Sequence, residues 1–347
     1  EGLLSYDGTY WKLYPLPNKT IVRSVEIGAD NKIYVGGQDE FGYFAPAKNG
    51  QLQYHSLITS LPDSERDFAD VWDIAYYKDE VFFKTSRRIF RLTSKRISIT
   101  HAPSEWSFMG ECKGKLYAHD IKMGLMTFEN DQWKSLPSGN LTNVEVTAIL
   151  PIKNAIIVTT LKNGVYTYRN TGATKIVSPA TSSIEKERVY TATAINNEWI
   201  GLGTTNGGVY IIDEKGNLIQ NLSKQEGLQN YNILSIFSDN QSNLWLGLNN
   251  GIDCIGFNKA IKLINPNYQD ASAYATIIHN DNLYVGTSSG LYSAPLHGAS
   301  DLSFNRGNFT AIKNSAGQVW GLANINDKLL LAHHEGAFKI QQKEDRL

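Results

Sequence analysis

The sequence predicts an all-β protein, a β-propeller of four-stranded antiparallel blades. A pattern of three short strands recurs along the chain, and neighbouring copies lie about 35 to 48 residues apart, which is the blade period of a propeller. The third strand of nearly every copy begins on a glycine. Such a fold buries each sheet between two others. An ordinary β-sandwich whose copies resemble each other by chance is the alternative.

The copy at Tyr231–Ile255 shows the pattern most clearly. Residues 233–237 are apolar on both sides, as expected for a strand packed on both faces. The polar residues 239–243 tolerate left-handed backbone angles and predict a turn. Residues 244–248 form the second strand, and after another turn the third is expected to run from Ile252 to Phe257. This copy is an antiparallel meander.

The other copies follow by alignment. Their second strands share a short apolar, often aromatic core, which recurs at residues 33–36, 81–84, 116–119, 156–159, 198–201, 244–247, 283–286 and 329–332. Arg88 replaces the usual glycine in the second copy. The chain starts with a third and an outer strand at residues 2–14, whose own first strands are missing, so we expect them to complete the last sheet. Counting gives seven full copies and one composite, and we expect seven blades, with eight as the alternative.

Length and composition bound the other properties. No linker divides the 347 residues, so we expect a single domain over 1–347, and because the chain begins at Glu1 we expect an excised piece of a longer protein. A net charge of −1 does not indicate the basic surface that nucleic-acid-binding proteins have. No apolar stretch is long enough to span a bilayer. Cys112 and Cys254 lie three copies apart, so we expect no disulfide between them.

The sequence contains no recognisable catalytic, metal or cofactor motif. The sequence lacks His and Cys residues at the spacing that binds zinc, and it lacks a nucleophile elbow and a calcium-binding loop. It also lacks a complete glycine motif for binding a dinucleotide. His119-Asp120 could act as an acid–base pair or cap a turn. His333 and His334 are adjacent on a strand and point to opposite faces. We therefore expect no enzyme, no cofactor and no metal.

Propeller geometry indicates where a binding site would form. The first strand of each blade begins, and the second ends, on one face around the central channel. The candidate ligand-binding residues at these junctions are Arg23, Gln38, Asp39, Glu40, Asp70, Trp72, Trp106, Asp120, Tyr190 and His333. Aromatic faces beside planar polar groups suit sugars. Core packing is the alternative for Trp72 and Trp106, and a solvated turn is the alternative for residues 38–40.

Two groups of residues also carry a family resemblance. The Asp239-Asn240 turn, residues 244–248 and residues 250–252 resemble the periplasmic sensor propellers of two-component and one-component regulators, found in Bacteroidetes regulators of polysaccharide use. Residues 36–44 resemble the subset whose propellers precede a triple-tyrosine domain and a kinase or helix-turn-helix output.

The resemblance implies a periplasmic sensor, with its membrane span and output module elsewhere in the full protein. It implies an oligosaccharide ligand, the downstream triple-tyrosine and output domains as partners, and no direct contact with nucleic acid. A homodimer is a further expectation, since propeller faces make broad platforms, and a pure dimerisation scaffold is one alternative function. A propeller lyase or hydrolase, of the kind represented by streptogramin lyases, is the other.

Overall fold

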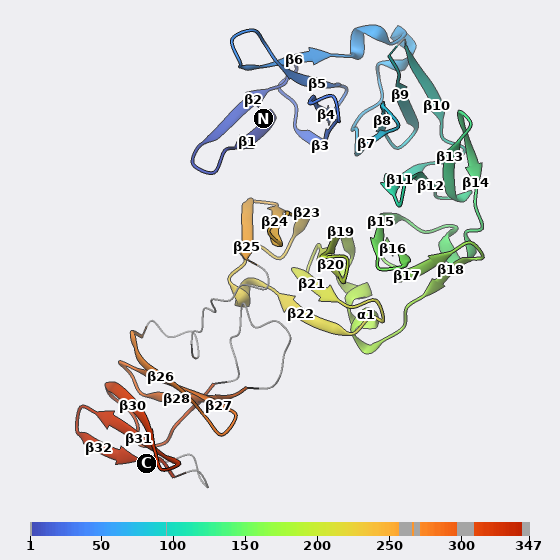
Figure 1. The fold of residues 1–347 in the computed structure, drawn as a ribbon. Coiled ribbons are helices and arrows are strands. Elements are labelled where there is room, and N and C mark those ends of the chain that lie inside the picture. Colours follow the sequence, from blue (N-terminus) through green and yellow to red (C-terminus); the bar gives the residue numbers. More distant parts are fainter. Residues whose placement is uncertain (1, 95, 257–265, 267–270, 297–308, 342–347) are drawn as a thin grey trace. The chain divides into compact units, whose positions relative to one another are not determined.

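The computed structural model describes residues 2–94, 96–256, 266, 271–296 and 309–341 (Figure 1). The chain divides into two compact units. Unit 1 comprises Glu1–Lys224, Leu228–Ser238 and Trp245–Asp253, and unit 2 comprises Gln225–Gly227, Asp239–Leu244 and Cys254–Leu347. The single domain over 1–347 stays a prediction.

Unit 1 begins with a two-stranded sheet and continues with five four-stranded antiparallel sheets in chain order. The pair is β1 (Gly2–Tyr6) and β2 (Trp11–Pro15). The first two blades are β3 (Val22–Ile27), β4 (Ile33–Gly37), β5 (Phe41–Pro46), β6 (Leu52–Ser56) and β7 (Asp73–Tyr77), β8 (Glu80–Lys84), β9 (Arg88–Leu92), β10 (Ile97–His101). The next two are β11 (Trp106–Cys112), β12 (Lys115–Asp120), β13 (Gly124–Glu129), β14 (Gln132–Ser135) and β15 (Val146–Ile152), β16 (Ala155–Thr160), β17 (Gly164–Arg169), β18 (Gly172–Lys175). The fifth is β19 (Val189–Ile195), β20 (Trp199–Thr204), β21 (Val209–Ile212), β22 (Leu218–Leu222).

Three further sheets follow. A three-stranded sheet that falls mainly in unit 1 contains β23 (Ile233–Ser238), β24 (Asn243–Leu248) and β25 (Gly251–Gly256). Unit 2 contains β26 (Ala273–His279), β27 (Asn282–Thr287), β28 (Leu291–Pro295), β29 (Thr310–Ala311) and a sheet of β30 (Val319–Ile325), β31 (Lys328–His333), β32 (Gly336–Lys339). The helical turns are η1 (Ile58–Ser60), η2 (Asp63–Glu65), η3 (Gly139–Leu141), α1 (Pro179–Ile184), η4 (Glu185–Glu187) and η5 (Lys224–Glu226).

These sheets confirm the predicted β-propeller of antiparallel blades. Among the described residues there are eight sheets of three or four strands besides the β1–β2 pair, which agrees with the larger of the two expected blade numbers. The expected third strand of the clearest copy matches β25, except that Phe257 lies outside the described residues. Completion of the last sheet by β1 and β2 would involve both units and stays a prediction.

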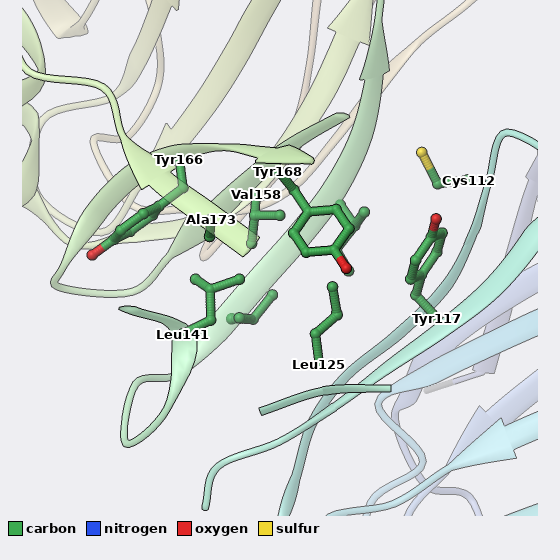
Figure 2. Close-up of a cluster of buried hydrophobic side chains, with 10 residues drawn as sticks. Cys112, Tyr117, Leu125, Leu141, Val158, Tyr166, Tyr168 and Ala173 are labelled. Atoms are coloured by element: carbon green, nitrogen blue, oxygen red, sulfur yellow. The ribbon is translucent and has the colours of Figure 1, made fainter. Parts of the chain in front are cut away.

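The first strand of each blade is innermost in unit 1. Strands β3, β7, β11, β15, β19 and β23 contact one another in sequence, and they line the concave side of the arc of blades in unit 1 (Figure 1). The core lies between the faces of neighbouring blades. Cys112, Tyr117 and Leu125 of one blade pack against Val158 and Tyr168 of the next (Figure 2). Because both faces of a middle strand are covered, the centres of such strands are mostly apolar, as in β8 and β16.

Candidate functional site

A β-bulge occurs near the start of the first strand in several blades. In β3, Val22 pairs with Gly37 and Ser24 with Gly36, which leaves Arg23 as the extra residue. Because a bulge bends its strand and re-aims a side chain, this residue leaves the regular alternation. The same shift in register occurs at Ser107 in β11, Thr147 in β15 and Tyr190 in β19. In unit 2 it occurs at Tyr274 in β26 and Trp320 in β30.

The entry to β7 places Trp72 in a comparable position. The Trp72 amide donates to the carbonyl of Lys84 over 2.9 Å, while Asp73 also pairs with Lys84 in the sheet register. Trp72 and Tyr190 remain 40% and 37% exposed. Unit 1 therefore presents large side chains at the inner start of several blades.

Three of these side chains form a contact group. Arg23 Nε donates to Asp70 Oδ1 over 2.9 Å, and the Arg23 guanidinium carbon lies 5.2 Å from the centre of the Trp72 ring. The ion pair joins the first blade to the segment that enters the second blade. Arginine stacked on an aromatic ring is a favourable cation–π arrangement. We call Arg23, Asp70, Trp72, Asp73, Glu145 and Tyr190 the inner rim.

Electrostatics connects Tyr190 to the rest of the inner rim. Burial raises the pKa of the Tyr190 hydroxyl, the charge of Arg23 lowers it, and the charges of Glu145, Asp73 and Asp70 raise it. Arg23, Asp73, Glu145 and Tyr190 lie in or directly before the first strands of four different blades. The charges of the first three nevertheless act on the Tyr190 phenol. The net result is a Tyr190 hydroxyl that stays protonated at neutral pH and can donate a hydrogen bond.

Buried ionic and polar groups support the inner rim from inside. The Lys84 side chain is 3% exposed, and its Nζ donates to Asp73 Oδ2 and to the Ser107 carbonyl, each over 2.9 Å. The amide of Met109 also donates to Asp73 Oδ2 over 3.1 Å. These bonds hold the second and third blades together next to Trp72.

His119 continues this network into the fourth blade. Its Nε2 donates to the Leu141 carbonyl over 2.6 Å, so Nδ1 is the acceptor for the Ser107 hydroxyl at 2.7 Å. The Val146 amide in turn donates to the Ser107 hydroxyl oxygen over 3.3 Å. Burial lowers the pKa of His119, which is fully buried. Both ring nitrogens are therefore engaged in a neutral imidazole.

Asp120 caps the turn that follows β12. Its carboxylate accepts from the hydroxyl and amide of Ser104 and from the amides of Glu105, Lys122 and Met123. Burial acts to raise the pKa of Asp120, but these hydrogen bonds outweigh burial and hold it below its ordinary value. The turn-capping alternative for this residue therefore matches the observed contacts.

The loop at residues 38–40 is fixed by its own carboxylates. Asp39 Oδ1 accepts from the amides of Phe68 and Ala69 over 3.1 and 2.7 Å. Glu40 is 7% exposed and accepts from the hydroxyls of Tyr54 and Ser56. Burial raises the pKa of Glu40. Gln38 is exposed and pairs through its backbone with Asp70.

Trp106 and His333 are the two remaining candidates. Trp106 is 2% exposed and packs with Phe82 and Leu116 in the core, which matches its core-packing alternative. His333 is in unit 2, where its Nε2 donates to the Ala316 carbonyl over 3.1 Å and its Nδ1 accepts from the Glu335 amide over 3.3 Å.

Sequence reasoning missed Asp73 and Glu145 of the inner rim and the bulge residues Ser107 and Trp320. A signal for the bulge was present, because a buried apolar residue precedes it in most copies. Among the described residues, no group of three or more His, Cys, Asp or Glu side chains is arranged to hold a metal ion. No helix in that part of the chain is long and apolar enough to cross a membrane.

Comparison with known proteins shows the fold. No protein-family model and no curated protein sequence matches the chain. The chain is similar to the extracellular domain of a hybrid two-component system from B. thetaiotaomicron, with a TM-score of 0.59 and 18% identity over 99% of this chain and 49% of that one. The chain thus spans about half the length of that structure.

Lyases with the same architecture are also similar. A streptogramin B lyase has a TM-score of 0.55 and 17% identity over 72% of this chain and 83% of that one. Virginiamycin B lyase from Staphylococcus aureus has a TM-score of 0.51 and 15% identity over 77% of this chain and 92% of that one. At these identities the likeness concerns the β-propeller fold alone.

Proposed function

We propose that this chain is the periplasmic sensor propeller of a signal-transduction regulator and that it binds an oligosaccharide at the inner rim. The observation that carries the proposal is the contact of Arg23 with Trp72 and Asp70 at the inner start of two blades. The Tyr190 hydroxyl, which comes from a third blade, lies within electrostatic range of Arg23. An aromatic face beside fixed hydrogen-bond donors is an arrangement that holds sugar rings.

The fold likeness to an extracellular domain of a two-component system supports the signalling part of the proposal. In this proposal a membrane span, a triple-tyrosine domain and an output module belong to the longer protein. Binding at the inner rim would be communicated to those partners, and a homodimer would be the signalling form. The chain itself makes no direct contact with nucleic acid.

Catalysis is the second candidate function, because two lyases share the fold. A lyase or hydrolase needs an available acid or base. The ring nitrogens of His119 and His333 are engaged by hydroxyl, carbonyl and amide groups. Neither imidazole is bonded to a carboxylate in these contacts, which supports binding without turnover.

Calorimetry on this chain with a panel of oligosaccharides tests the proposal, and chromatography of the same mixtures checks for products. We expect a saturable heat with at least one sugar and unchanged sugars afterwards. Trp72→Ala should weaken binding about tenfold or more, equivalent to about 1.4 kcal/mol. Trp11→Ala is the control, because Trp11 is 50% exposed and lies on β2 outside the inner rim. Product formation, or equal binding by Trp72→Ala, would refute the proposal.

A further inference from the structure

The guanidinium of Arg23 is held along one edge and open along the other. Its Nε donates to Asp70 and its plane lies near the Trp72 ring. Within the described part of the chain, neither Nη1 nor Nη2 makes a hydrogen bond, and the side chain is 35% exposed. A guanidinium has five N–H donors in a fixed fork, so most of its donors remain available.

The free edge of Arg23 suits a planar pair of acceptor oxygens. Two parallel N–H···O bonds from an arginine to a carboxylate are shorter and stronger than neutral hydrogen bonds. Asp70 and Trp72 already restrict the Arg23 side chain, so less rotamer freedom is lost on binding than for a mobile arginine. The bulge in β3 gives this side chain its direction.

The surrounding charges determine whether an anionic group is tolerated. Asp73 is paired with Lys84 at 2.9 Å, and Asp70 is paired with Arg23 at the same distance. Glu145 is exposed and has no ion pair among the described residues, and its charge reaches Tyr190. Among the inner-rim carboxylates, only Glu145 therefore lacks a cationic partner in the described part of the chain, and a ligand carboxylate at Arg23 would be repelled by this one charge.

We propose that Arg23 anchors the carboxylate of an acidic sugar, a uronate, through Nη1 and Nη2. Asp70 acts as the positioning residue for Arg23, and Trp72 and Tyr190 lie beside the sugar ring. Glu145 limits the affinity, because its charge repels the ligand. This inference rests on the proposed function and specifies its ligand class.

Calorimetry with matched sugars tests the inference. The probes are trisaccharides containing galacturonate or glucuronate, each with its neutral hexose counterpart of the same linkage. We expect at least one uronate to bind about tenfold tighter than its counterpart, the factor that corresponds to 1.4 kcal/mol. Arg23→Lys keeps the charge but loses the fork, and should lose most of that preference. Arg169→Lys, an exposed arginine at the end of β17, should bind as the unmodified chain does.

A second variant reports on the charge balance. Glu145→Gln should raise the ratio of uronate affinity to neutral-sugar affinity about twofold to fivefold at low salt. Equal affinity for uronates and neutral sugars, or a full preference in Arg23→Lys, would overturn the inference while leaving oligosaccharide binding intact. Binding of no sugar by a chain with an unchanged circular dichroism spectrum would overturn both proposals.

Discussion

Replacing His119 by glutamine should remove a specific pH dependence from the stability of the chain. Burial lowers the pKa of His119 from the ordinary value of 6.5. At pH 7.5 and above, the imidazole is almost entirely neutral in both the folded and the unfolded chain, so the full stability is present. As the pH falls below 6.5, the unfolded chain takes up a proton that the folded chain resists. Stability is therefore lost as the pH falls, by up to about 1.4 kcal/mol per pH unit.

The hydrogen bonds of His119 contribute to stability independently of its titration. His119→Ala would leave the Leu141 carbonyl and the Ser107 hydroxyl without their partner, at about 1–3 kcal/mol for each buried group. His119→Gln can keep both hydrogen bonds with its amide and does not titrate. At pH 7.5, His119→Gln should therefore lose less stability than His119→Ala. The glutamine variant thus removes the titrating group while keeping the hydrogen bonds.

Urea unfolding followed by tryptophan fluorescence measures both effects. From pH 7.5 to 5.5, the unmodified chain should lose up to about 1.4 kcal/mol more stability than His119→Gln. An identical loss in the two proteins would refute the reasoning, because it would mean that His119 has the same pKa in the folded and unfolded chain. A larger loss in the glutamine variant would contradict the direction of the pKa shift.

Three further predictions concern the scaffold. Gly42→Ala should destabilise the chain by about 2 kcal/mol or more in urea unfolding, because a Cβ there would collide with a backbone carbonyl of β6. Asp73→Ala should cost about 3–5 kcal/mol in the same assay, since it leaves the buried Lys84 ammonium without its carboxylate. The thiol of the exposed Cys254 should react quickly with a thiol reagent at pH 8. Burial raises the pKa of Cys112 to about 11, so the Cys112 thiol should react only when the chain unfolds.

Matched measurements make these predictions refutable. Gly321→Ala places its Cβ at an ordinary 3.5 Å from the Ala332 side chain, so its stability should change little. Equal effects at the two glycines would contradict the steric argument. Lys84→Met should be milder than Asp73→Ala, because it leaves a partly exposed carboxylate rather than a buried charge. Two thiols reacting at equal rates in the folded chain would contradict the burial of Cys112.

The repeat pattern predicted the strands well because the physical constraint is local. A middle strand that is covered on both faces by neighbouring blades is mostly apolar. Residues 244–248 show this pattern, and β24 covers Asn243–Leu248. Turn residues in left-handed conformations, such as Asn196 and Asn280, separate the strands where the sequence places polar pairs. The expected number of seven blades was too low, because the described residues contain eight sheets of three or four strands besides the β1–β2 pair.

The candidate site was predicted only in part, because the position of a residue in a blade does not fix the direction of its side chain. Arg23 and Tyr190 are re-aimed by bulges and remain accessible. Asp120 and Glu40 occupy comparable junctions, but their carboxylates accept hydrogen bonds from nearby groups of the chain. Which junction residue is accessible depends on register and on hydrogen-bond partners several residues away.

A crystal structure of this chain with a bound uronate oligosaccharide would test the central claim most directly. We predict that the sugar lies against Trp72 and Tyr190, with its carboxylate within hydrogen-bond distance of Arg23 Nη1 and Nη2. A sugar bound elsewhere on the chain, with the inner rim empty, would contradict the claim.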